Sequence, residues 1–194
     1  MPQPTIELLV HSLAGTRRVA ASIAELSRPG DVIVLAGEMG AGKTAFAQGF
    51  GKALGVTEPI TSPTFTLVHS YDVPEAAGFG RCQLHHADLY RLDRTAEVAD
   101  LALVELAEDR GIVLVEWGDV VDTLLGDHLA VHLDADTSLL DASALDDERV
   151  SPATDGALDQ FGLDAERAIS LAPVGSAWAQ RWDRLVAAVE EFRC

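Results

Sequence analysis

The chain has 194 residues, 48% of them hydrophobic, and its 31 acidic and 14 basic residues give a formal net charge of −17. This size predicts a single domain over residues 1–194. Nothing in the acidic balance suggests a basic nucleic-acid-binding face, so we expect a partner to hold any RNA that is involved. Cys82 and Cys194 make neither a disulfide framework nor a metal cluster. With no signal peptide at the start and no apolar run of about 20 residues, we expect a cytoplasmic protein without a membrane anchor.

The first part of the chain predicts alternating strands and helices. Short apolar runs at 5–10 and 31–36 are typical of strands, and the β-branched residues of the second run are typical of a buried one. Apolar residues at helical spacing predict helices over 16–26 and 44–54, with Gly55 placed to end the second helix.

A glycine loop, GEMGAGKT at residues 37–44, lies between the second strand and the second helix. It matches G-x-x-x-x-G-K-[ST], the phosphate-binding loop of P-loop NTPases, in the strand–loop–helix context that this motif requires. Its glycines allow positive φ and a close approach of N–H groups to a pyrophosphate, to which the helix N-terminus adds a favourable dipole. Lys43 is expected to reach the β- and γ-phosphates, and Thr44 to offer its hydroxyl to Mg²⁺. The predicted nucleotide contacts are Glu38, Met39, Gly40, Ala41, Gly42, Lys43, Thr44 and Ala45.

The segment after this helix contains a candidate switch. Ser62, Pro63 and Thr64 form a loop before residues 64–71, whose alternation is typical of a half-buried strand. In a P-loop protein, a loop threonine such as Thr64 can sense the γ-phosphate and Mg²⁺. An ordinary Ser-Pro turn is the alternative interpretation of the same residues.

A hairpin loop predicted over 72–80 leads into a strand predicted over 81–90. Adjacent residues point to opposite faces of a strand, so His85 and His86 make a poor pair of metal ligands. Asp88 lies near the end of the strand, where it suits a magnesium site or an interface. A solvated turn residue is the alternative.

The next strand ends in a second candidate acid. An amphipathic helix predicted over 95–109 precedes the apolar run 112–115, and Glu116 closes that run. The carboxyl ends of core strands face the phosphates in P-loop ATPases, so a magnesium-binding acid is expected at this place. A Glu closing a buried strand has to be hydrated, paired or metal-bound. Trp117 either belongs to the core or packs near the nucleotide.

The last part of the chain is acidic before it returns to regular structure. Alternation over 128–136 predicts a strand, and ten acids against one base follow between Asp134 and Glu166. This composition predicts a solvated acidic surface insert at about 137–162. A strand over 167–173 and an amphipathic helix over 175–192 complete the predicted elements.

Motifs that the chain lacks narrow the kind of P-loop protein. Its two lysines, Lys43 and Lys52, stand in no Asn-Lys-x-Asp motif, which disfavours a GTPase. A Leu-Ser-Gly-Gly-Gln stretch is absent, which disfavours a transporter-type ATPase. The arginines of the second half are scattered among acids and form no basic lid of the kind that a small-molecule kinase needs. This pattern favours a small ATPase whose hydrolysis drives a partner.

Four stretches, in this order and spacing, resemble the TsaE family, also called YjeE. They are GEMGAGKT at 37–44, SPTFT at 62–66, HADLYRL at 86–92 and VEWG at 115–118. That family is the ATPase of bacterial tRNA threonylcarbamoyladenosine synthesis. The resemblance implies an α/β fold with a P-loop NTPase-like core, in which a mixed sheet has parallel central strands, added antiparallel strands and flanking helices.

The resemblance also implies partners. Family members work with TsaD and TsaB, which transfer a threonylcarbamoyl group to the adenosine next to the anticodon, and ATP hydrolysis by TsaE resets that complex for further rounds. We therefore expect an accessory protein that is a monomer on its own, binds TsaD and TsaB homologues and reaches tRNA only through them. Because the chain offers no obvious arginine finger, this Mg²⁺-dependent ATPase should be weak alone and stimulated by its partner.

Residue roles follow from the same resemblance. Lys43, Glu116 and Asp88 are expected to be catalytic, and Thr44 and Glu116 to hold Mg²⁺. From their residue types alone, Ser12 and Thr16 are expected to cap the first helix. Only the resemblance suggests that they lie near the nucleotide. The contacts to ATP or ADP outside the loop are then Ser12, Thr16, Thr64, Trp117 and Arg167.

Two other functions stay open. A nucleotide-gated binding module would use ATP or ADP only to switch the surface of residues 62–66, and hydrolysis would be incidental. A small-molecule kinase of the P-loop class would transfer the phosphate to a metabolite instead of releasing it.

Overall fold

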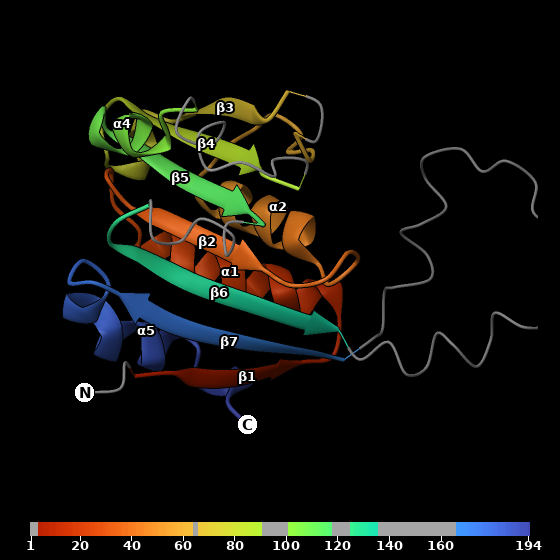
Figure 1. The fold of residues 1–194 in the computed structure, drawn as a ribbon. Helices are drawn as coiled ribbons and strands as arrows, with labels where there is room; N and C mark the ends of the chain where they lie inside the picture. The colour runs from red at the N-terminus through yellow and green to blue at the C-terminus, as the bar shows by residue number, and fades with distance from the viewer. Residues whose placement is uncertain (1–3, 64–65, 91–100, 118–124, 136–165) are drawn as a thin grey trace, which may run out of the picture.

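The structure is a computed structural model, and it describes the chain except for residues 1–3, 64–65, 91–100, 118–124 and 136–165. Strands and helices alternate along most of the described chain (Figure 1). The strands are β1 (Ile6–Val10), β2 (Val32–Ala36), β3 (Val68–Val73), β4 (Cys82–Asp88), β5 (Gly111–Glu116), β6 (His128–Ala135) and β7 (Arg167–Val174). The α-helices are α1 (Leu13–Leu26), α2 (Lys43–Ala53), α4 (Leu103–Glu108) and α5 (Trp182–Ala188).

All seven strands form one mixed sheet in the order β1-β7-β6-β2-β5-β4-β3. The central strands β6, β2, β5 and β4 are parallel, since β2 pairs with β5 and β6, and β4 pairs with β5. Antiparallel pairs extend the sheet on both sides, through β7 and β1 at one end and β3 at the other. The α/β fold with a mixed sheet is therefore as the sequence predicts.

Helices cover both faces of the sheet (Figure 1). Residues of α1, α2 and α5 pack in one hydrophobic cluster with β1, β6 and β7, whereas α4 packs with β5 in a second cluster on the opposite face. Both β2 and β5 are buried along their whole length, which explains their continuous apolar sequence. Gly49 lets α1 and α2 approach closely, because a Cβ there would lie 2.6 Å from the backbone of Arg17.

Several element boundaries differ from the prediction. The first helix begins at Leu13 rather than at residue 16, because Ser12 caps it, and β3 begins at Val68 rather than at residue 64. The helix predicted over 95–109 is described only as α4, and its first residues lie outside the described chain.

The predicted continuous helix over 175–192 is wrong. The chain there forms a 3₁₀ helix at Ala179–Arg181, then α5, then a second 3₁₀ helix at Glu190–Phe192. A 3₁₀ turn places residues three apart on the same side. This spacing places Trp178 on the same side as Arg181, and Val189 on the same side as Phe192, and all four residues are buried.

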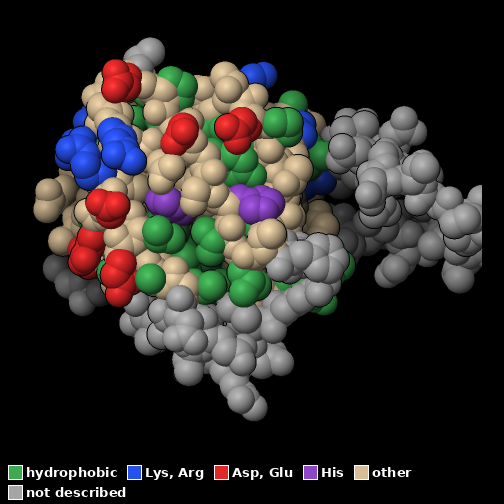
Figure 2. Space-filling model, turned by 90° about the horizontal axis from the view of Figure 1, so that it is seen from above, with side chains coloured by type: hydrophobic (Ala, Val, Ile, Leu, Met, Phe, Trp, Pro, Cys, Tyr) green, Lys and Arg blue, Asp and Glu red, His purple; other side chains and the backbone are tan. Residues whose placement is uncertain are grey.

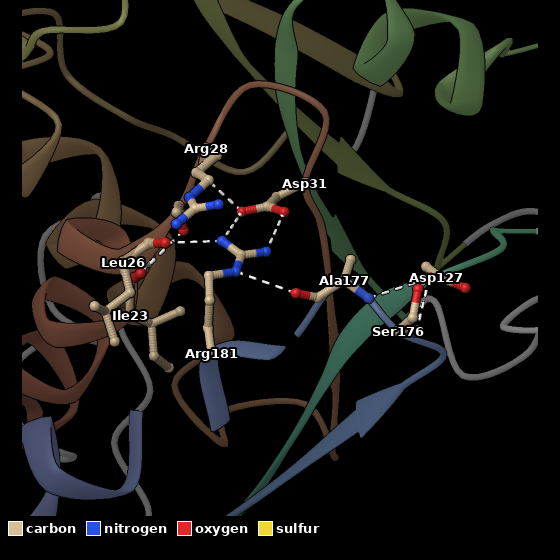
Figure 3. Close-up of polar contacts among 9 residues, drawn as sticks. Ile23, Leu26, Arg28, Asp31, Asp127, Ser176, Ala177 and Arg181 are labelled. Atoms are coloured by element: carbon tan, nitrogen blue, oxygen red, sulfur yellow. Dashed lines mark hydrogen bonds and ion pairs between the residues drawn. The ribbon is translucent and has the colours of Figure 1, made fainter. Parts of the chain in front are cut away.

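A buried ion pair between Arg181 and Asp31 connects the start of the C-terminal helical segment to the residue before β2 (Figure 3). Arg181 donates from Nη1 and Nη2 to the two carboxylate oxygens of Asp31, at 2.7 and 2.6 Å, and both residues are buried. Arg181 also donates to the carbonyls of Leu26, at 2.8 Å, and Ala177, at 3.2 Å. The pair thus joins the residue before β2, the end of α1 and the segment after β7 in one hydrogen-bonded network.

No helix among the described residues is both long enough and apolar enough to cross a membrane. In the view from the β3 side, acidic side chains lie in several places, and a group of lysine and arginine side chains lies at one edge between acidic ones (Figure 2). On the described part of this face, basic side chains do not extend across the surface as a continuous patch.

Candidate nucleotide and magnesium site

The glycine loop runs from the carboxyl end of β2 into the N-terminus of α2, and its backbone has the left-handed geometry that the motif needs. The φ angles are +132° at Gly37, +85° at Gly40 and +107° at Gly42. A Cβ at Gly37 would lie 2.1 Å from the carbonyl oxygen of Leu133 on β6, so the loop backbone passes too close to that strand for any larger residue.

Lys43, the first residue of α2, folds back over the loop. It is 5% exposed, and its Nζ donates to the carbonyls of Gly37 at 2.7 Å and Glu38 at 2.8 Å. The same Nζ lies 3.7 Å from the ring centroid of Trp117. The ring centroids of Trp117 and Tyr90 are 5.1 Å apart. Trp117 has a φ of +61°, a strained angle for a residue with a large side chain, directly after β5.

Glu116 ends β5 beside the first turn of α2. Its Oε1 accepts a hydrogen bond from the Thr44 hydroxyl at 3.2 Å and lies 2.9 Å from His86 Nε2. Glu116 is 3% exposed, and a buried carboxylate of this kind needs such partners. Thr44 and Glu116 are 72 residues apart in sequence, and their side chains meet between the loop and the sheet at the candidate magnesium position.

Asp88 lies opposite Glu116 in the register of the parallel pair β4–β5, at the same edge of the sheet. Its two oxygens accept from the Ser62 hydroxyl at 2.8 Å and the Tyr90 backbone N–H at 3.0 Å. Through Ser62, the loop that the sequence marks as a candidate switch is hydrogen-bonded to an acid of the site. Thr64, the predicted sensor within that loop, lies outside the described residues.

Of the nucleotide contacts predicted outside the glycine loop, Ser12 and Thr16 serve the start of α1, whereas Arg167 lies beside the loop. Ser12 caps α1 by accepting from the Gly15 N–H at 3.2 Å, and Thr16 donates to the Ser12 carbonyl at 3.4 Å with no exposed surface of its own. The burial of Thr16 favours its structural role over a direct contact. Arg167, at the start of β7, borders the loop, because a Cβ on Gly42 would lie 3.4 Å from its Nε. Arg167 is 2% exposed, and this burial lowers the pKa of its guanidinium.

An open hollow of about 340 Å³ adjoins the start of the glycine loop. It is lined by residues that follow β2 and β5 and by residues of β6: Gly37, Glu38, Trp117, His132, Leu133 and Asp134. The described residues include no group of three or more His, Cys, Asp and Glu side chains able to hold a metal by themselves.

The structure therefore brings most predicted site residues to one edge of the sheet. Lys43, Thr44, Asp88, Glu116 and Trp117 meet there, and Met39 of the loop is 71% exposed. Sequence reasoning missed His86 and Tyr90. The available signal for His86 was its position two residues before Asp88, because alternate residues of a strand share a face.

This fold and loop define the class, an α/β protein with a P-loop-like core. The family model described as "Threonylcarbamoyl adenosine biosynthesis protein TsaE" matches residues 10–142, and the chain belongs to this TsaE family. The family is named for the biosynthesis of threonylcarbamoyladenosine, a modification of tRNA.

Two curated relatives carry the name tRNA threonylcarbamoyladenosine biosynthesis protein TsaE. The one from Bacillus subtilis (strain 168) is 39% identical over 110 residues, which are 57% of this chain and 65% of that protein. The one from Nostoc (strain PCC 7120) is 43% identical over 110 residues, which are 54% of this chain and 62% of that protein. The chain thus spans slightly less than two thirds of the length of either relative.

A solved structure agrees with the fold over nearly the whole chain. The crystal structure of Bacillus subtilis YdiB superposes with a TM-score of 0.64 at 26% sequence identity, covering 98% of this chain and 97% of that one.

Proposed function

We propose that this protein is a Mg²⁺-dependent ATPase that drives repeated rounds of tRNA threonylcarbamoyladenosine modification by a complex of TsaD and TsaB homologues. The observation that carries the proposal is the hydrogen bond between Thr44 and Glu116, which ties the last residue of the glycine loop to the acid at the end of β5. Family membership supports the part of the proposal that concerns tRNA modification, and the Thr44–Glu116 pair supports Mg²⁺-dependent ATP hydrolysis.

The residues suit phosphoryl transfer by positioning and charge. Lys43 and the N–H groups of the loop would neutralise charge that develops on the γ-phosphoryl group. Thr44 and Glu116 would hold Mg²⁺ by oxygen, and Arg167, beside Gly42, would contact the nucleotide. Mg²⁺, when bound, neutralises charge on the β- and γ-phosphates. Asp88 would orient the attacking water or transmit the state of the site to the partner through Ser62.

The partner is expected to complete this site. Because the sequence offers no obvious arginine finger, we expect hydrolysis to be slow until a partner group adds further positive charge. The formal net charge of −17 supports tRNA contact only through the complex, because a protein that binds the nucleic-acid backbone directly needs clustered positive charge.

A turnover count tests this proposal. The purified protein is mixed with TsaD and TsaB homologues, the modification machinery, tRNA and ATP, and modified tRNAs are counted per complex. The proposal predicts several modified tRNAs per complex with the protein present and about one without it. It also predicts that phosphate release rises when the partners are added. A count that does not depend on this protein would overturn it.

A second candidate is a nucleotide-gated binding module, favoured by the bond between Ser62 and Asp88 that couples residues 62–66 to the site. Glu116→Gln separates the two functions. The ATPase proposal predicts that this variant still forms the complex but stops after the first round of modification. The gated module predicts that complex formation and repeated modification both persist.

A further inference from the structure

His86 is a buried polar residue that the proposed chemistry does not use. It lies on β4 with no exposed surface, and its Nε2 is 2.9 Å from Glu116 Oε1. Leu84, two residues earlier on the same face of β4, is an equally buried apolar residue. On this buried face, the contact with Glu116 gives the imidazole of His86 a polar partner.

The hydrogen bonds of His86 indicate which nitrogen carries the proton. Its Nδ1 is buried and makes no hydrogen bond to any residue that the structure describes. A proton on Nδ1 would leave a buried donor unsatisfied and would turn the Nε2 lone pair toward a carboxylate oxygen. A proton on Nε2 places the single polar hydrogen on Glu116 instead. His86 therefore donates from Nε2 to Oε1.

Two donors from different elements thus converge on one oxygen of Glu116. Thr44 approaches from α2 at 3.2 Å, and His86 approaches from β4 at 2.9 Å. Because both hydrogen bonds end on Oε1, they fix the rotation of the carboxylate and leave Oε2 as the oxygen available to a cation. Partners that hold a metal-binding carboxylate in this way affect metal affinity without touching the metal.

We propose that His86 is a positioning residue for the magnesium site, holding the Glu116 carboxylate in the orientation that binds Mg²⁺. The proposal rests on the proposed function, because it requires that Glu116 bind the nucleotide's Mg²⁺. It differs from a purely structural role in one respect. Loss of the donor should weaken nucleotide binding only when Mg²⁺ is present.

Two substitutions of nearly equal size test this difference. In His86→Gln, the amide nitrogen reaches about the place of Nε2 and can still donate to Glu116. In His86→Asn, it reaches only the place of Nδ1 and cannot. The affinity for ADP is measured by titration calorimetry for the full-length chain, once with excess Mg²⁺ and once with EDTA. Thermal unfolding of each variant shows whether it is folded.

His85→Asn is the matched control. His85 is the neighbouring buried histidine on the opposite face of β4, where its Nδ1 lies 2.8 Å from the Ser70 hydroxyl and has no part in the site. The shorter amide retains a polar nitrogen near that hydroxyl. ADP affinity of this control is expected to match the unsubstituted protein with and without Mg²⁺.

We expect His86→Asn to bind ADP about tenfold more weakly in Mg²⁺ and unchanged in EDTA, with His86→Gln within about threefold of the unsubstituted protein. Two results would overturn the positioning role and leave the proposed function standing. In the first, His86→Asn binds ADP in Mg²⁺ as tightly as the unsubstituted protein; in the second, its ADP affinity falls as much in EDTA as in Mg²⁺. If His86→Asn does not fold, His86→Gln decides, since a folded Gln variant that loses the Mg²⁺ effect contradicts the proposal. An unsubstituted protein whose ADP affinity ignores Mg²⁺ would overturn the proposed function as well.

Discussion

At the scale of single residues, Lys43 brings positive charge to the glycine loop. Lys43→Ala should weaken ADP binding by about 10- to 100-fold, because it removes hydrogen bonds from a charged donor to the phosphates. Lys52→Ala is the control, since Lys52 is the other lysine of the chain and is exposed near the far end of α2. Calorimetric titration with ADP measures both variants. Similar affinity in the two would contradict the assigned role of Lys43.

Two glycines of the loop make a second pair at this scale. Gly37 and Gly40 both have positive φ, but a Cβ would meet the Leu133 carbonyl at 2.1 Å in the first case and nothing within 4 Å in the second. Gly40→Ala should cost about 1–2 kcal/mol of unfolding free energy, the penalty of a left-handed alanine. Gly37→Ala should cost clearly more, because the backbone of the loop or of β6 has to move. Urea unfolding compares them, and equal losses would show that the approach to β6 is not tight.

At the scale of elements, the buried pair of Asp31 and Arg181 provides a test far from the site. Arg181→Met should destabilise the protein by about 3–5 kcal/mol, because it leaves the Asp31 carboxylate buried without its charged partner. Adding Asp31→Leu should recover much of that loss, since the lone buried charge is then gone. Chemical unfolding measures these changes. Arg184→Met, at an exposed position of α5, should change stability by less than about 0.5 kcal/mol, and a similar loss there would contradict this explanation.

Local pattern explains why most elements could be predicted. Glu116 could be assigned because a continuous apolar run ends at it, and runs of that kind are typical of buried parallel strands. The Asp31–Arg181 pair could not, because its partners are 150 residues apart and no local spacing connects them. The contact of His86 with Glu116 depends in the same way on the β4–β5 register, which only the folded sheet reveals.

At the scale of the whole molecule, the predicted acidic insert at 137–162 lies outside the described residues, but the chain on either side of it is fixed. Ala135 at the end of β6 pairs with Arg167 at the start of β7. A short turn should therefore be able to replace residues 137–164. We expect the shortened protein to bind ADP as before and to be more stable by about 1 kcal/mol, because a shorter loop costs less entropy to close. Thermal unfolding and ADP titration measure this. Loss of ADP binding would show that the segment belongs to the site.

The account as a whole rests on a nucleotide and its Mg²⁺ lying between the glycine loop and the end of β5. A crystal structure of the protein with ADP and Mg²⁺ tests this most directly. We predict an ion about 2.0–2.1 Å from the Thr44 hydroxyl, with Glu116 bound to it directly or through one water and the Lys43 ammonium on the phosphates. An ion separated from Glu116 by more than two waters, or a nucleotide bound away from residues 37–44, would contradict the account.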